Sequence, residues 1–313
     1  MSRVITSGLQ CVLIGFLLGV LLNSPTRARG GTQSADRASS VTMAPSLPGE
    51  IRILVGFRDG KGRPVPVPSK ETLTARLDET PIEIEDLRPL RNEPLIFSLI
   101  VDKSGSSRSN GDKQTAAAVS LFRALSTGDN HGYLTVFKDG VSASKQFAYP
   151  SEVEQILKEI PPGGGTALYD AIEVVCKEQL NSNLLPPNSR RAIFVFSDGG
   201  DNTSHIPLTK TIEVAQKAGI PIISIKLRVD TEGKRQEKGE LAALKSLTES
   251  TGGMSVLPDE DRDELGQLPS LLEGQSVLTL KTPELKHKKT YTLKIESLLK
   301  NVKVLSPAEF IAP

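Results

Sequence analysis

The spacing of apolar residues changes twice along this chain. Between residues 49 and 91, short runs in which apolar and polar positions alternate predict strands, and no pattern long enough for an amphipathic helix occurs. Ile51–Phe57 is one such run, and Leu73–Leu77 with Pro81–Glu85 forms a predicted hairpin. After Gly274 the helical spacing stops and alternation returns in further predicted strands, at Val277–Leu280, Tyr291–Ile295 and Val302–Val304.

The middle of the chain follows another pattern, in which apolar runs alternate with segments of helical spacing. Leu95–Val101, Arg191–Phe196 and Ile220–Leu227 are almost continuously apolar, as expected for strands that are covered on both faces. Shorter strands are predicted at Gly132–Phe137, Ser142–Phe147 and Met254–Leu257. Helices are predicted at Thr115–Leu125, Ser151–Ile160, Thr166–Leu180, Lys210–Ala218, Leu241–Ser250 and Asp259–Leu272. The alternation predicts the α/β fold class, with a doubly wound, mainly parallel sheet wrapped by helices on both sides.

The first thirty residues have the composition of a targeting segment. Arg3 gives a short basic start, the run Cys11–Leu22 is apolar, and Asn23–Arg29 is polar and basic. We expect residues 1–30 to be a signal peptide or, if Val4 and Ile5 extend the span toward the roughly 20 residues that a bilayer requires, a retained N-terminal membrane anchor. Either interpretation predicts an exported protein, secreted, periplasmic or anchored with its folded part outside the cytoplasm.

The rest of the chain divides into four parts. Residues 31–48 are rich in Ser, Thr, Ala, Gly and Pro, and are a predicted flexible linker. An N-terminal β segment at 49–91 precedes the α/β domain, which is expected at 92–273. A second β segment follows at 274–313.

Composition and charge narrow the functional class. The 313 residues carry 38 Lys and Arg against 37 Asp and Glu, and this balance argues against a general nucleic-acid binder, which needs clustered positive charge. An aromatic content of 4% without Trp argues against an aromatic platform for sugars or bases. Outside the first thirty residues one cysteine remains, Cys176, and its apolar neighbours at helical spacing predict that it packs as a small apolar side chain.

The candidate chemistry lies where the predicted strands end. In an open α/β sheet, ligands bind beyond the carboxyl ends of the strands. Asp102, Ser104 and Ser106 directly follow the first buried strand. Thr166 follows three glycines at the start of a predicted helix, and Asp198 follows the second buried strand. These five side chains offer only carboxylate and hydroxyl oxygens, a donor set that suits a hard divalent cation such as Mg²⁺.

The spacing in Asp102-x-Ser104-x-Ser106 has a physical reason. A loop that leaves a strand in extended form points alternate side chains the same way, and Gly105 permits the tight bend that follows. Lys103 is then predicted to point away from the motif and face solvent. Each cluster alone has an ordinary interpretation as a turn or a helix N-cap. The three clusters together, in this order and each at a strand or helix junction, are a far more specific signal for a metal site than any one of them alone.

The five residues resemble the metal-ion-dependent adhesion site of the von Willebrand factor type A domain. The family motif is an Asp-x-Ser-x-Ser loop with a distant Thr and a distant Asp, and this chain matches it without departure. The resemblance covers roughly residues 92–272. The flanking segments look like those of exported bacterial proteins with a domain related to this family, which implies that the two β segments pack together as a small β-sandwich.

The resemblance implies a divalent-metal-dependent protein-binding or adhesion module without enzymatic activity. The hydroxyls of Ser104, Ser106 and Thr166 would contact Mg²⁺ (or Mn²⁺ or Ca²⁺) directly or nearly so. Asp102 and Asp198 would act largely through bound water. An ion with few direct anionic ligands stays electrophilic, so it would capture an acidic side chain of a protein partner at its open position.

Two alternatives stay open from the residues alone. An exported hydrolase would use Ser104 or Ser106 as its nucleophile, with His131, His205 or His287 as the base, although the sequence has no Gly-x-Ser-x-Gly elbow. A structural scaffold with an unused metal site is the other alternative. The intact set of five residues argues against it.

Overall fold

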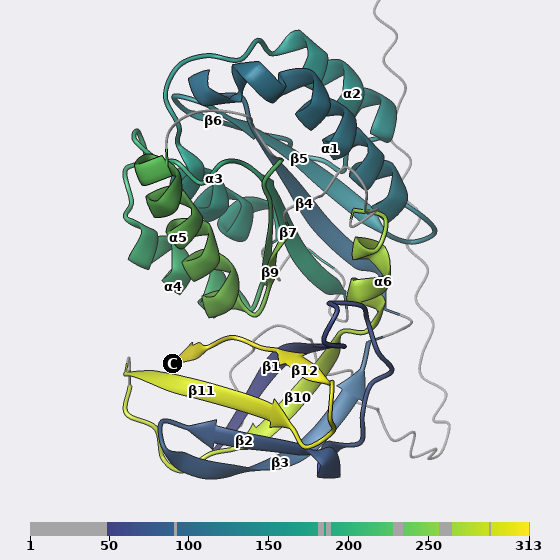
Figure 1. The fold of residues 1–313 in the computed structure, drawn as a ribbon, viewed down its shortest axis with the longest axis vertical. Coiled ribbons are helices and arrows are strands. Elements are labelled where there is room, and N and C mark those ends of the chain that lie inside the picture. The colour runs from purple at the N-terminus through teal and green to yellow at the C-terminus, as the bar shows by residue number, and fades with distance from the viewer. Residues whose placement is uncertain are drawn as a thin grey trace, which may run out of the picture. The chain divides into compact units, whose positions relative to one another are not determined.

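The computed structural model describes residues 49–90, 93–180, 185, 189–227, 234–256, 265–287 and 289–312. The predicted leader at 1–30 and the linker at 31–48 lie outside the described residues. Within the described residues the strands form one six-stranded sheet and one seven-stranded sheet (Figure 1). No helix in this part of the chain combines the length and apolar character needed to cross a bilayer.

The six-stranded sheet forms the centre of the α/β domain. Its order is β6-β5-β4-β7-β8-β9, and only the pairing of β6 with β5 is antiparallel. The central strands β4 and β7 are buried at every position, as their continuous apolar runs predicted. The bounds are β4 (Leu95–Asp102), β5 (His131–Phe137), β6 (Val141–Ala143), β7 (Arg190–Phe196), β8 (Ile222–Ile225) and β9 (Met254–Val256).

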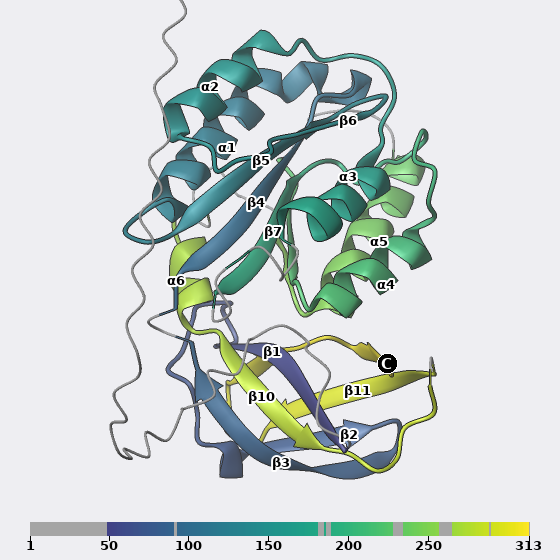
Figure 2. The same ribbon diagram turned by 180° about the vertical axis from the view of Figure 1, so that it is seen from behind.

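Helices cover both faces of this sheet, as Figures 1 and 2 show from opposite sides. Alternate residues of β4 enter two separate cores: Phe97 packs with α1 and α2 on one face, and Ile100 with α3, α4 and α5 on the other. The predicted fold class is therefore confirmed. The helices are α1 (Gly111–Leu125), α2 (Pro150–Glu159), α3 (Leu168–Val174), α4 (Leu208–Ala218), α5 (Lys234–Thr251) and α6 (Leu268–Glu273).

The two β segments join in one curled antiparallel sheet. β10 lies between β1 and β3, and β11 pairs with β2, so strands from before and after the α/β domain are interleaved in the order β12-β1-β10-β3-β2-β11-β13. The core of this sheet takes residues from both segments, including Phe57 and Leu278. The bounds are β1 (Glu50–Arg58), β2 (Leu73–Leu77), β3 (Thr80–Pro89), β10 (Ser276–Lys281), β11 (Thr290–Ser297), β12 (Lys303–Leu305) and β13 (Glu309–Ile311).

The helix predicted at Thr166–Leu180 is interrupted. A π-helical turn, η3 (Val175–Gln179), follows α3 and places Gln179 in the core. The Gln179 Oε1 accepts hydrogen bonds from Ser98 Oγ at 2.7 Å and Thr135 Oγ1 at 3.1 Å. Cys176 in the same turn is 4% exposed, and burial raises the pKa of its thiol to about 12. It packs as the small apolar side chain that the sequence predicted.

The start of α2 differs from the sequence expectation. Ser151 and Glu154 have the spacing of a capping box, but the helix begins earlier, with Pro150 in its first turn. The backbone N–H of Tyr149 donates to Glu152 Oε2 at 2.9 Å. Glu154 instead accepts from Lys158 and Arg123 on the helix surface. The proline fixes the helical φ one residue before the serine and moves the cap with it.

Candidate functional site

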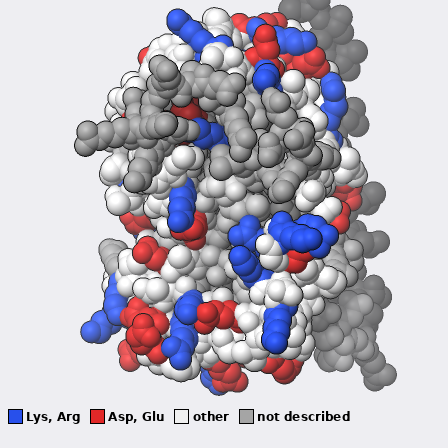
Figure 3. Space-filling model, in the orientation of Figure 1, with Lys and Arg blue, Asp and Glu red and all other residues white. Residues whose placement is uncertain are grey.

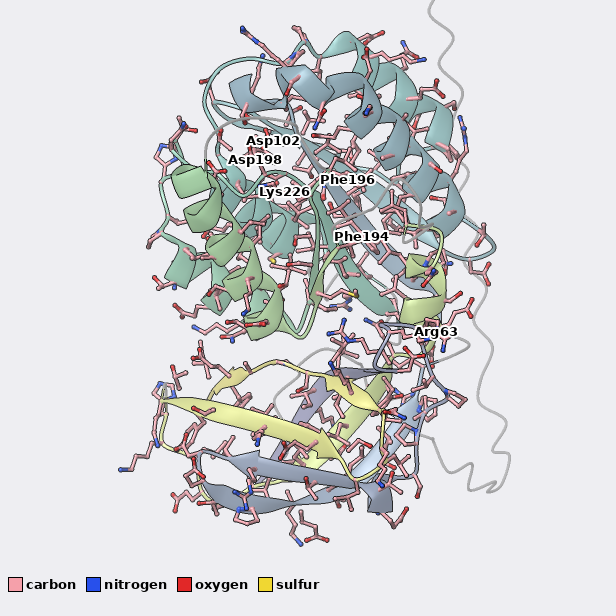
Figure 4. The ribbon with its side chains drawn as sticks, in the orientation of Figure 1. Arg63, Asp102, Phe194, Phe196, Asp198 and Lys226 are labelled. Carbon is pink, nitrogen blue, oxygen red and sulfur yellow. The ribbon has the colours of Figure 1, made fainter. Side chains whose placement is uncertain are left out.

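The three predicted clusters meet at the carboxyl end of the parallel sheet. Asp102 is the last residue of β4, and Asp198 follows β7 by two residues; Figure 4 shows the two carboxylates near one another at this end of the sheet. The glycine loop before α3 is tied to the first cluster, because Gly105 N donates to Gly164 O at 3.1 Å. The same loop is tied to the segment after β7 that carries Asp198, because Asn202 N donates to Thr166 O at 3.0 Å.

Asp102 is a buried carboxylate at 1% exposure. Its Oδ1 accepts from the backbone N–H of Ser104 and its Oδ2 from the Ser197 hydroxyl, each at 2.8 Å. Burial raises the pKa of Asp102; the hydrogen bonds from Ser104 and Ser197 act in the opposite direction, and the charge of Asp198 raises the pKa further. The site thus holds a carboxylate whose ionised form is disfavoured unless a cation is near.

The two serines of the motif point toward each other. Ser104 has extended backbone angles, φ −68° and ψ 178°, and the short 3₁₀ helix η2 (Gly105–Asn110) begins directly after it. The Oγ atoms of Ser104 and Ser106 lie 3.1 Å apart. Ser104 is fully buried and Ser106 is exposed, so the pair runs from the floor of the site to its opening.

The glycine loop holds Thr166 by close packing. Gly164 has φ +81°, and a Cβ there would lie 2.0 Å from Asp139 Oδ2. A Cβ at Gly165 would lie 2.4 Å from Thr203 Cγ2. The glycines are therefore required for the loop to fit between its neighbours. Thr166, 7% exposed, follows directly and donates its N–H to Asn202 Oδ1 at 2.8 Å.

Asp198 is half-buried in the loop after β7. Its Oδ1 accepts the N–H of Gly200 at 3.1 Å. Gly199 between them has φ +95°, and a Cβ there would lie 2.6 Å from the backbone oxygen of Glu240 in α5. The loop is thus fixed against α5 in a conformation that keeps Asp198 at the end of the sheet.

The donor set fits a hard divalent cation. The loops that carry the two carboxylates and three hydroxyls meet at this end of the sheet, and neither Asp102 nor Asp198 forms an ion pair with a described Lys, Arg or His. Within the described ranges no group of three or more His, Cys, Asp or Glu side chains gathers. A metal at this position would therefore depend on the hydroxyls of Ser104, Ser106 and Thr166, as Mg²⁺ and its relatives allow.

Lys103 does not face solvent, so that prediction is wrong. Its side chain is 4% exposed, and its Nζ donates to Thr115 Oγ1 on α1 at 3.1 Å. Burial lowers the pKa of this ammonium, while the charge of Asp112 opposes that effect. The side chain does point away from its motif neighbours, but helix α1 covers the position that it reaches.

Asp201, in the loop after β7, and Asp170, at the start of α3, both have structural roles. The structure makes both of them supports for the start of α3. Asp201 Oδ2 accepts the N–H of Tyr169 at 2.9 Å and the Ser204 hydroxyl at 2.7 Å. Asp170 accepts His205 N, and its Oδ2 lies 2.7 Å from His205 Nδ1. The loop after β7 is therefore attached to α3 by side chains.

Three contributors to the site were missed from sequence. Ser197 is adjacent to Asp198, so its place in the motif loop was the only available signal. Asp139 and Asn202 hold the glycine loop by tertiary contacts, Asp139 Oδ1 accepting Gly165 N at 2.5 Å. Asn202 lies only four residues after Asp198, but neither Asn202 nor Asp139 belongs to the motif, so no pattern in the sequence reveals these contacts.

Residues 97–200 match the family model of the von Willebrand factor type A domain. No curated protein is similar enough to the chain to count as a relative. Among solved structures, a von Willebrand factor type A protein from Catenulispora acidiphila aligns at 10% identity and TM-score 0.48, over 88% of this chain and 74% of that one. BatB from Bacteroides thetaiotaomicron aligns at 15% identity and TM-score 0.44, over 57% and 97%. Proximal thread matrix protein 1 from the mussel byssus, described with a zinc-occupied MIDAS motif, aligns at 14% and 0.45, over 61% and 48%.

Proposed function

Because residues 97–200 form a von Willebrand factor type A domain, we propose that the chain is a divalent-metal-dependent protein-binding module. The ion is Mg²⁺, or Mn²⁺ or Ca²⁺ in its place. A carboxylate of a partner protein completes its coordination, so the module binds its partner through the metal and carries out no bond-making step.

The observation that carries this proposal is that three loops, which together bear five oxygen-donor side chains including the buried carboxylate of Asp102, meet at one end of the sheet. Asp102 lies at the floor with both oxygens engaged by hydrogen-bond donors, and Ser104 and Ser106 lead from it to the surface. A bound divalent ion would offset the repulsion between Asp102 and Asp198 and supply an electrophilic site for the partner.

The residues of the chain have distinct tasks in this proposal. Ser104, Ser106 and Thr166 hold the ion with neutral oxygens, while Asp102 and Asp198 balance its charge. Neutral ligands leave more of the ion's charge for an incoming carboxylate. The exposed Ser106 lies where that carboxylate enters.

The place of action follows from the leader. We propose that residues 1–30 direct export, so that the module works outside the cytoplasm, either released or anchored. Comparing the N-terminus of the mature protein with Met1 by mass spectrometry separates a cleaved signal peptide from a retained anchor.

Metal binding is tested first by itself. Calorimetric titration of Mg²⁺ and Mn²⁺ into the purified protein is expected to show one site, lost in Asp198→Ala and weakened at least tenfold in Ser106→Ala, since each hydroxyl ligand is worth about 1.4 kcal/mol or more in such a site. Ser109→Ala is the matched control, because Ser109 is exposed in the same short helix η2. Equal metal affinity in Asp198→Ala and wild type would reject the site.

Partner binding is tested by capture from the exported fraction with Mg²⁺ and with EDTA. The proposal expects a protein that is retained with Mg²⁺, released by EDTA and absent with Asp198→Ala. Capture that is the same in EDTA would show that binding does not pass through the metal. Circular dichroism of each variant confirms that the fold is kept.

A further inference from the structure

A groove lies beside the candidate metal site, between α1 and α2. It has a volume of about 1030 Å³ and extends from the 3₁₀ helix η2 along the two helices. Its charged lining residues are the cations Lys103, Arg108, Lys113, Arg123 and Lys158 and the carboxylates Asp112 and Glu154. Figure 3 shows basic and acidic side chains together at the top of the molecule, over these helices.

The groove is more basic than the protein as a whole. Five cationic side chains face two carboxylates there, whereas the complete chain has a net charge of only +1. The two cations of the outer part, Arg123 and Lys158, share the single carboxylate of Glu154 at 2.9 and 2.7 Å. Cations thus outnumber carboxylates among the lining residues, and an occupant with negative charge complements them.

Arg108 links the groove to the candidate metal site. It follows Ser106 by two residues in η2, and its side chain lines the groove. Its Nε donates to Pro162 O at 3.4 Å, and its guanidinium forms no ion pair with any carboxylate that the structure describes. A guanidinium has five N–H donors, so most of its capacity to bind an anion is available.

Lys103 provides a second cation on the inner wall. It is the residue between Asp102 and Ser104, yet its ammonium lines the groove, 4% exposed, with a neutral hydroxyl at hydrogen-bond distance. Thr115 Oγ1 accepts from one of the three N–H donors of this ammonium, and the charge of Asp112 also acts on it, so a carboxylate in the groove would add to this compensation of a buried charge.

The remaining lining is apolar. Val119 of α1 and Leu157 of α2 contribute to it, with Ile160, Pro161 and Pro162 at the end nearest the glycine loop. A peptide segment, with a backbone and aliphatic groups between its charges, matches this mixture better than a small free anion does.

We infer that this groove receives an acidic segment of the partner protein that continues from the carboxylate at the metal, with Arg108 as its first ionic contact. The inference rests on the proposed function, because the direction of the segment is set by the metal-bound carboxylate. It identifies the partner class as a protein with clustered Asp or Glu residues around its binding carboxylate.

The probe for this inference is a fluorescent peptide with glutamates spaced by alanines, compared with the same peptide carrying one glutamate and glutamines elsewhere. Fluorescence anisotropy with Mg²⁺ is expected to show tighter binding of the acidic peptide. Arg108→Gln should weaken its binding about tenfold, as loss of a charge-assisted contact does, and Arg108→Glu more. Lys217→Gln is the control, because Lys217 pairs with Glu213 on α4, on the other face of the sheet.

The outcomes separate this inference from the proposed function. Unchanged Mg²⁺ affinity with weaker peptide binding in Arg108→Gln supports it. Binding of the acidic peptide that needs Mg²⁺ but is equal in wild type, Arg108→Gln and Lys158→Gln overturns the groove and leaves the metal site standing. Equal binding of the acidic and single-glutamate peptides, or no binding of the acidic peptide by the Mg²⁺-loaded protein, also overturns it. Binding that depends on Arg108 but is the same in EDTA rejects the metal bridge instead.

Discussion

The hydroxyl of Ser197 donates a hydrogen bond to Oδ2 of Asp102 at 2.8 Å, and so connects the ends of the two central strands β7 and β4. The same Ser197 Oγ accepts the N–H of Gly199 at 3.0 Å. One side chain outside the five-residue motif thus fixes both the carboxylate of Asp102 after β4 and the backbone of Gly199 in the loop after β7. The position of Asp102 relative to Asp198 depends on this contact.

Ser197→Ala is therefore expected to destabilise the protein and to disturb the candidate metal site. Asp102 Oδ2 loses a buried donor and Gly199 N loses its acceptor, which should lower the free energy of unfolding by about 1 to 3 kcal/mol. The pKa of Asp102 should rise further, since the lost hydrogen bond acts to lower it. Urea unfolding measures the loss of stability, and Mg²⁺ titration measures the effect on metal affinity. Ser109→Ala serves as the control, and a Ser197→Ala protein with unchanged stability and unchanged Mg²⁺ affinity would contradict the assigned role.

The raised pKa of Asp102 predicts how metal and pH act together. Its cause is burial first and the charge of Asp198 in addition. A carboxyl group whose pKa is raised by folding stabilises the metal-free protein below its unfolded pKa near 3.8, and that contribution is lost as the pH rises through the raised value. Mg²⁺ binds the ionised form, so it should raise the melting temperature more near pH 7 than near pH 4. Equal shifts at both pH values, or an equal shift in Asp102→Asn, would contradict this.

The strands and the motif could be predicted because their signals are local. The continuous apolar run at Leu95–Val101 marks a strand covered on both faces, and Asp102 necessarily follows it. The fold brings Thr166 and Asp198 to the same edge, since parallel strands end together there. The structure supports the arrangement of the motif; its metal remains a prediction.

The features that were missed depend on contacts between distant segments. Lys103 is buried because α1 lies over it, which the alternation in its own loop cannot reveal. The π turn that places Gln179 in the core is set by polar partners on β4 and β5, and helical spacing alone predicts an uninterrupted helix. Strand β13 is only three residues long and is recognised through its pairing with β11.

Gln179 gives a stability prediction from these buried contacts. Gln179→Leu keeps the apolar volume but leaves the hydroxyls of Ser98 and Thr135 without their acceptor in the core. The expected loss is about 2 to 4 kcal/mol of unfolding free energy, from two buried hydroxyls. Gln155→Leu on the exposed face of α2 is the control, and chemical denaturation measures both. A loss in Gln179→Leu no larger than in Gln155→Leu would show that the network is not needed.

Gly199 gives a prediction about the loop that carries Asp198. In Gly199→Ala, the new Cβ meets the backbone oxygen of Glu240 at 2.6 Å, and the φ of +95° is unfavourable for alanine. We expect about 2 to 4 kcal/mol of destabilisation and weaker Mg²⁺ binding, because the loop must move away from α5. Gly140→Ala is the matched control, since no atom lies within 4 Å of a Cβ there. Equal stability of the two variants would show that the loop tolerates the displacement.

The pair of Asp170 and His205, which joins α3 to the loop after β7, gives a pH prediction. A hydrogen bond and the charge of Asp170 raise the pKa of His205, although its side chain is 92% exposed. The contribution of this pair to folding stability is fully present below the ordinary histidine pKa near 6.5, and it is lost as the pH rises through the raised pKa. In an NMR titration, Asp170→Asn should return the His205 pKa to its ordinary range, because the charge of the carboxylate is gone, whereas Asp112→Asn should leave it raised. A His205 pKa that stays raised in Asp170→Asn would mean that another group causes the shift.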